Sequence, residues 1–99
     1  MLYMILGEDA PGTLDKRLAA RPAHVRRIEE LSNEGRLMLA GPCPAIDAPD
    51  PGPAGFTGSL IVAEFPSLAD ARTWAKADPY VAAGVFAGVT VKPFRKTLP

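Results

Sequence analysis

One apolar segment, Gly58–Phe65, sets strong limits on the fold of this chain. It is rich in β-branched and other apolar residues, which predicts a β-strand. Successive side chains of a strand point to opposite faces of the sheet, and here both faces are apolar. The residues that share one face are Ser59, Ile61, Ala63 and Phe65. Residues 2 to 7 show the same two-sided pattern, so both strands need cover on each side of their sheet.

Two further strands and two helices complete the predicted elements. Thr13 is placed to cap a helix that runs to about Glu34, with Gly35 as its C-terminal stop. Pro22 interrupts this helix, which predicts either a kink or two abutting helices. The remaining predicted elements are a strand over 36–41, a helix over 68–77 and a strand over 85–91.

The order of these elements predicts a ferredoxin-like α+β fold of the βαββαβ type, with a four-stranded antiparallel sheet and both helices on one face. The 99 residues suffice for a single domain, 1–99. Two helices cover only one face, so the other would expose an apolar patch too large for a soluble monomer. We therefore expect a homodimer, with a cleft between sheet and helices or at the dimer seam. The candidate interface residues are Ile5, Leu39, Ile61, Val89 and Val91, or their neighbours on the alternate face.

A proline-rich segment, Pro42–Gly55, lies between the two middle strands. Its five prolines disfavour both a helix and a central strand. Proline also lowers the conformational entropy of a loop, which suits a fixed wall better than a mobile lid. We expect this loop to lie beside the cleft and to shape access to it.

Composition argues against several classes of function. Eleven Lys and Arg residues balance eleven Asp and Glu residues, which argues against a nucleic-acid-binding protein that relies on phosphate neutralisation. The first residues lack a basic region and their apolar run is short, so we expect neither a signal peptide nor a membrane span. The single cysteine, Cys43, excludes an intrachain disulfide and fits a reducing cytoplasm.

The chain offers no spaced set of metal ligands and no phosphate-binding loop. It has one histidine and one cysteine, and neither HxxxH nor CxxC occurs. Walker A and GxGxxG motifs are also missing from it, and nothing marks a haem or flavin site. We expect a protein that works on a small-molecule ligand without metal or cofactor.

The first helix carries the candidate site residues. One stripe of that helix consists of Leu14, Leu18, Val25, Ile28 and Leu31. His24 falls within the stripe, so it faces inward or onto a cleft. Arg17 and Arg21 lie four residues apart just before His24, and Ser59 is a polar residue on an apolar strand. With Tyr80 they are the predicted ligand-orienting residues, although each could equally form a surface salt bridge or a cap.

Asp78 occupies an unusual position at the end of the second helix. Helix C-termini disfavour carboxylates, yet Asp78 stands there directly before Pro79. One explanation is that Asp78 caps a short turn that starts at Pro79. The other is that function holds the carboxylate there, and both roles can coexist.

Several blocks together resemble the YciI-like family. They are Arg21-x-x-His24, the strand from Gly35 to Pro42, Gly58-Ser59, the Trp74 helix, Asp78-Pro79-Tyr80 with Ala83-Gly84-Val85, and Val91-Lys92-Pro93-Phe94. The resemblance spans essentially the whole chain. It implies the dimeric α+β barrel fold, which includes muconolactone isomerase and small cofactor-free monooxygenases. It also implies a histidine–aspartate pair as the active site, matched here by His24 and Asp78. The chemistry it implies is proton transfer on small ring compounds, including loss of chloride from chlorinated hydroxylated aromatics.

Three functions are compatible with these features. The first is a lyase, isomerase or dehydrochlorinase in which His24 is the general base and Asp78 fixes its tautomer. The second is a non-catalytic module that binds a small metabolite. The third is a structural dimer in which His24 is a satisfied core residue.

Overall fold

Four β-strands form a single antiparallel sheet in the computed structural model, which describes residues 1–99. The strands are β1 (Leu2–Asp9), β2 (Leu37–Pro44), β3 (Phe56–Glu64) and β4 (Phe86–Phe94). Their order is β2-β3-β1-β4, so the two strands with apolar residues on both faces lie at the centre. The predicted βαββαβ order and the ferredoxin-like α+β class are confirmed.

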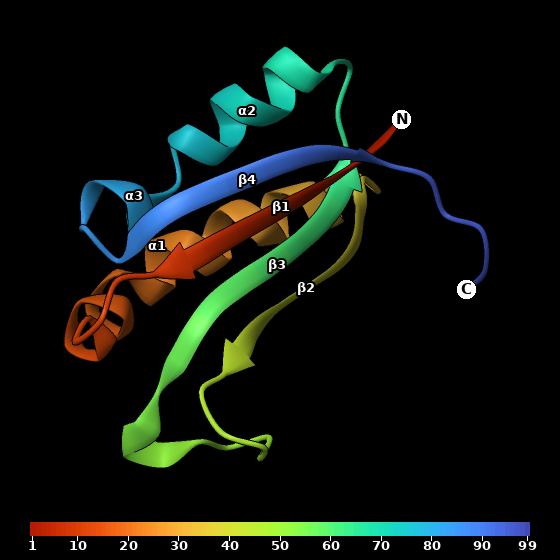
Figure 1. The fold of residues 1–99 in the computed structure, drawn as a ribbon. Coiled ribbons are helices and arrows are strands. Elements are labelled where there is room, and N and C mark those ends of the chain that lie inside the picture. The colour runs from red at the N-terminus through yellow and green to blue at the C-terminus, as the bar shows by residue number, and fades with distance from the viewer.

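The helices α1 (Leu14–Asn33) and α2 (Leu68–Lys76) pack on one face of this sheet (Figure 1). A one-turn helix, α3 (Pro79–Ala82), leads from α2 into β4, and a 3-10 turn, η1 (Gly52–Ala54), precedes β3. The core lies between sheet and helices. Its buried residues are Tyr3, Ile5, Leu31, Ile61, Ala63, Phe65, Ala71 and Ala75.

Helix α1 begins after Thr13, as predicted, but Thr13 makes no side-chain cap bond, and the helix continues through Pro22. The Thr13 hydroxyl donates to the Ala10 carbonyl oxygen at 2.7 Å and makes no cap bond to the helix. Pro22 lies inside one continuous helix, so the alternative of two abutting helices is wrong. Gly35 does end the helix, with φ of +72° and with the Arg36 N–H donating to the Leu31 carbonyl at 2.9 Å. This bond is the mark of a Schellman motif, which requires positive φ and therefore favours glycine.

The inward side of α1 differs from the predicted apolar stripe at one place, where Arg17 is buried instead of Leu18. The buried residues Arg17, His24 and Leu31 follow one another at seven-residue intervals. Leu18, predicted to face inward, is 55% exposed. His24 and Leu31 face inward as predicted, and Arg17 adds a second polar side chain to the side of α1 that faces the sheet.

Strand β2 is longer than predicted because it forms an edge of the sheet. It continues through Pro42 and Pro44, for which the sequence predicts a loop. Proline is tolerated at an edge, where its missing N–H removes no bond to a second neighbour. The connection that follows is therefore confined to residues 45–55.

The sheet keeps apolar side chains on the face that carries no helix. Pairing places Ile5, Ile61, Val89 and Val91 toward the helices. Of the candidate interface residues only Leu39 points away from them. The neighbours that share its face are Met4, Leu6, Leu60 and Val62. No helix of the chain has the length and apolar character needed to cross a bilayer.

Candidate active site

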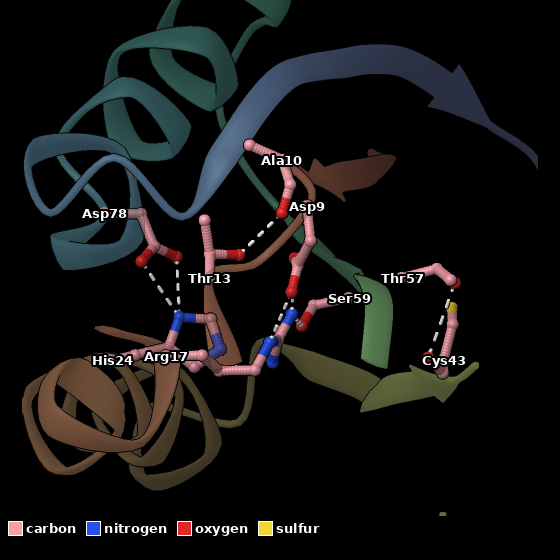
Figure 2. Close-up of polar contacts among 9 residues, drawn as sticks. All are labelled: Asp9, Ala10, Thr13, Arg17, His24, Cys43, Thr57, Ser59 and Asp78. Carbon is pink, nitrogen blue, oxygen red and sulfur yellow. Dashed lines mark hydrogen bonds and ion pairs between the residues drawn. The ribbon is translucent and has the colours of Figure 1, made fainter. Parts of the chain in front are cut away.

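His24 and Asp78 come from α1 and the start of α3 and lie in direct contact (Figure 2). His24 Nδ1 is 2.9 Å from Oδ1 and 2.8 Å from Oδ2 of the carboxylate, and both side chains are buried. An ionised carboxylate can only accept hydrogen bonds, so Nδ1 carries the proton that is shared with Asp78. In the neutral ring the lone pair is then on Nε2, which is the form that accepts a proton.

Asp78 also caps α3. Its Oδ1 accepts the Tyr80 N–H at 2.9 Å, and Pro79 follows it at the first helical position. The capping role and the contact with His24 thus occur together in one side chain. The turn that begins at Pro79 holds the carboxylate against the imidazole.

Tyr80 fixes the plane of the His24 ring. The two rings are stacked with centroids 3.9 Å apart and planes 15° apart. Phe86 meets Tyr80 edge-on at 5.3 Å, and the Phe86 ring occupies the space beside Gly7 that any larger residue would fill. A hydrogen bond at one edge and an aromatic face together leave the imidazole little freedom.

We expect Tyr80 to make the protein less stable above pH 10. Burial raises the pKa of the Tyr80 phenol above its usual value of 10.0, against the opposing charges of Arg17 and Arg21. Above pH 10 the unfolded chain releases this proton while the native chain keeps it, so the free energy of unfolding falls as pH rises. Urea denaturation on both sides of pH 10 measures the fall. In the Tyr80→Phe variant the free energy of unfolding should fall less above pH 10. An equal fall in that variant would show that Tyr80 is not the group responsible.

A second polar contact lies beside the first, on the preceding turns of α1. Arg17 donates from Nε to Asp9 Oδ2 at 2.7 Å and from Nη2 to Asp9 Oδ1 at 2.8 Å (Figure 2). Nη2 also donates to Ser59 Oγ at 2.9 Å, and the Arg17 Cζ lies 4.6 Å from the Tyr80 centroid. Burial lowers the pKa of Arg17, but the hydrogen bond and charge of Asp9 outweigh it and leave the pKa raised. The positive charge of Arg17 is therefore already matched.

Sequence reasoning did not single out Asp9. It ends β1 beside an irregularity in the pairing with β4, where the chain turns toward α1. Nothing in its local sequence distinguishes it from other acidic residues next to a turn. The sequence did hold one signal for the partner of Asp9. Arg17 precedes His24 by seven residues, which places both on the same side of a helix.

A cavity of about 220 Å³ opens between α1 and the strands β2 and β3. The predicted residues His24, Arg17, Arg21 and Ser59 all line it. Its apolar wall includes Val25, Ile28, Ala40 and Ile61. Asp78 and Tyr80 do not line it and lie behind His24, so Nε2 is the ring nitrogen that remains for a ligand.

Only the start of the segment Pro42–Gly55 lies at this cavity. Pro42 lines it from β2, whereas Ala45 and Pro53–Gly55 line a separate hollow of about 420 Å³ next to Asp9. That hollow lacks His24 and Arg21 and holds no titratable side chain except Asp9 and Asp15. The chemistry of the predicted residues is thus confined to the smaller cavity.

Arg27 links α1 to the end of α2 just before Asp78. Its Nη2 donates to the Trp74 carbonyl at 2.8 Å, and its Cζ lies 4.2 Å from the Trp74 ring centroid. Burial lowers the pKa of Arg27, with the charge of Asp78 opposing this. Arg27 therefore steadies the segment that delivers Asp78 and adds positive charge in its neighbourhood.

A solved structure shares this arrangement of elements. TftG from Burkholderia phenoliruptrix, a 5-chloro-2-hydroxyhydroquinone dehydrochlorinase solved in complex with 2,5-dihydroxybenzoquinone, has a TM-score of 0.83. The two chains are 27% identical, and the match covers 96% of this chain and 94% of TftG.

Sequence comparison gives nearer relatives. Protein YciI from Escherichia coli is 59% identical over 96 residues, which cover 97% of this chain and 98% of that protein. An uncharacterised protein from Haemophilus influenzae is 54% identical with the same coverage. The profile of the YCII-related domain matches residues 1–95. The chain therefore belongs to the YCII-related domain family.

Proposed function

We propose that this protein is a small-molecule enzyme in which His24 acts as a general base and Asp78 holds it in the active tautomer. The observation that carries the proposal is the buried contact between Nδ1 and the Asp78 carboxylate, in a residue that also lines the cavity. It leaves Nε2 to accept a proton from a ligand. No cofactor is needed for such a step.

The reaction class that fits best is elimination or isomerisation on a small hydroxylated ring. The base removes a proton from a hydroxyl or ring carbon, and the electron pair left behind forms a new double bond. In a dehydrochlorination a hydroxyl proton first moves to the chlorine-bearing carbon as the ring tautomerises to its keto form. The pair released by the base then expels chloride from that sp3 carbon, so hydrogen chloride is lost as a proton on His24 and a chloride ion. The likeness to TftG, a dehydrochlorinase, supports this class.

Chloride release and absorbance changes test the proposal. A panel of chlorinated hydroquinones, catechols and lactones would be incubated with the protein, and each rate compared with that of a protein-free sample. We expect turnover of at least one member. Tight binding without turnover across the panel would instead favour the alternative function, a module that binds a small metabolite.

We also propose that the protein is a homodimer whose copies meet through the helix-free face of the sheet. This face carries Met4, Leu6 and Leu60 in its middle, and Leu39 on it is 48% exposed. The helices leave this apolar surface bare, and a second copy with the same face would cover it.

We expect Leu39→Asp to weaken the dimer by about 100-fold or more. Burial of one leucine contributes about 1.5–3 kcal/mol, and a two-fold interface loses this contribution twice. Leu18→Asp is the matched control, because Leu18 is 55% exposed on the opposite side of the molecule. Sedimentation over a dilution series measures both variants. A parent protein that sediments as a folded monomer would rule the dimer out.

A further inference from the structure

We infer that Arg21 binds the anionic oxygen of the ligand, and that the site selects a small ring that carries one negative charge when bound. The inference rests on the proposed function in that it concerns the same cavity. It goes further by assigning one residue to one group of the ligand. The argument uses the charges that line the cavity, its size and the position of Arg21.

Arg21 is the cation at the cavity that has no partner. Arg17 is matched by Asp9 through two hydrogen bonds, and His24 is matched by Asp78. Arg21 lines the cavity, and its exposed side chain takes part in no ion pair and no hydrogen bond. Its charge therefore remains for a ligand, whereas the guanidinium of Arg17 is occupied by the protein itself.

The volume of the cavity suits one substituted ring. A cavity of about 150 Å³ is enough to hold benzene, and the cavity here measures about 220 Å³. The remainder accommodates a few polar substituents. The apolar wall of Val25, Ile28 and Ile61 can cover the ring while Arg21, His24 and Ser59 meet its substituents.

Proton transfer from a ligand hydroxyl to His24 produces an imidazolium and an oxyanion, and Asp78 and Arg21 are placed to meet these two charges. Arg21 and His24 are three apart on α1 and line the same cavity, and the charge of Arg21 reaches Tyr80 behind His24. When a neutral ligand loses a hydroxyl proton, the O–H bond breaks, the proton binds Nε2 and the electron pair stays on the oxygen. The imidazolium then faces Asp78, and the new oxyanion faces Arg21.

Charge balance favours one negative charge on the ligand. Of the charged groups that line the cavity, Arg17 is paired with Asp9, and Arg21 is the one whose charge no side chain of the cavity matches. Transfer of one proton from the ligand to His24 leaves one oxyanion for Arg21 and one imidazolium for Asp78. A dianion would leave one charge unmatched in a partly buried cavity, which is costly, and a cation would be repelled by Arg21.

Binding of 4-nitrocatechol tests the inference, because its neutral and anionic forms differ in colour. The titration is run at a pH below the first ionisation of the free ligand, so that the free ligand is neutral. We expect the bound ligand to show the spectrum of the anion. We expect Arg21→Gln to weaken binding by about 10- to 100-fold, the range for a hydrogen bond to a charged group.

Two controls isolate the role of Arg21. Arg26→Gln removes the same charge from an exposed position on α1 outside the cavity and should leave the dissociation constant unchanged. The neutral ligand 1,2-dimethoxy-4-nitrobenzene has no proton to lose, so its binding should respond equally weakly to both substitutions.

Three results would overturn the inference. They are equal binding of 4-nitrocatechol by the parent and Arg21→Gln, a bound ligand with the spectrum of the neutral form, and no binding at millimolar concentration. None of these measurements requires turnover. If the spectrum and the Arg21 effect are observed while the substrate panel shows no reaction, the proposed function fails and the assignment of Arg21 stands.

Discussion

The His24→Gln variant is expected to lose about 10²- to 10⁴-fold in turnover of a validated substrate, the usual contribution of a positioned general base. Glutamine retains a polar side chain of similar reach and cannot accept the proton as imidazole does. The quantity to measure is kcat, together with thermal unfolding to show that the variant is folded. If the rate survives this substitution, His24 is not the base, even though its contact with Asp78 is present.

Asp78→Asn is the sharper companion variant. Asparagine caps a helix about as well as aspartate, so α3 should remain folded. Its amide can donate to Nδ1, which would move the ring proton to Nε2 and abolish the acceptor that faces the cavity. We expect turnover to fall with little change in stability. A large loss of stability with unchanged turnover per folded molecule would assign Asp78 to capping alone.

The largest effect on stability is expected at the contact between Asp9 and Arg17. Asp9→Asn should lower the free energy of unfolding by about 3–5 kcal/mol, because it leaves a guanidinium buried without its countercharge. The two side chains are only 4% and 5% exposed, so little water can replace the lost partner. Urea denaturation at neutral pH measures the change.

Glu34→Gln is the matched control for Asp9→Asn. It also removes a carboxylate from an arginine, at 2.9 Å from Arg36, but the Glu34 side chain is 56% exposed. Exposed pairs contribute about 0–1 kcal/mol, so this variant should unfold almost like the parent. If both variants lost a similar free energy of unfolding, burial of the Asp9–Arg17 contact would not be what makes it stabilising.

The sequence predicted the fold correctly where the pattern of apolar residues allowed only one position for a strand. Strands apolar on both faces had to lie at the centre of a sheet, and β1 and β3 do. The edge position of β2 could not be predicted from its own residues, because Pro42 and Pro44 are compatible with either a loop or an edge strand. The inward side of α1 was misjudged at Leu18, because Arg17 takes the buried place only where Asp9 can meet it.

The site residue that could be predicted from local sequence is Asp78, which both caps a helix and contacts His24. Asp78 was identified because a carboxylate before Pro79 is out of place at a helix end and in place at a cap. His24 followed from its position on α1 and from the family resemblance. Asp9 was missed because the choice of an ion-pair partner depends on how a turn folds back, which no spacing along the chain records.

Asp78 both caps α3 and contacts His24, and this affects which residue best shows whether a related protein has kept the chemistry. A lineage that abandoned the chemistry would still need a residue that accepts the Tyr80 N–H, so an aspartate there would persist for reasons of folding. His24 caps nothing, and its ring makes its one polar contact with that carboxylate. Drift to another side chain at position 24 would therefore be the more informative sign that a relative has stopped moving protons.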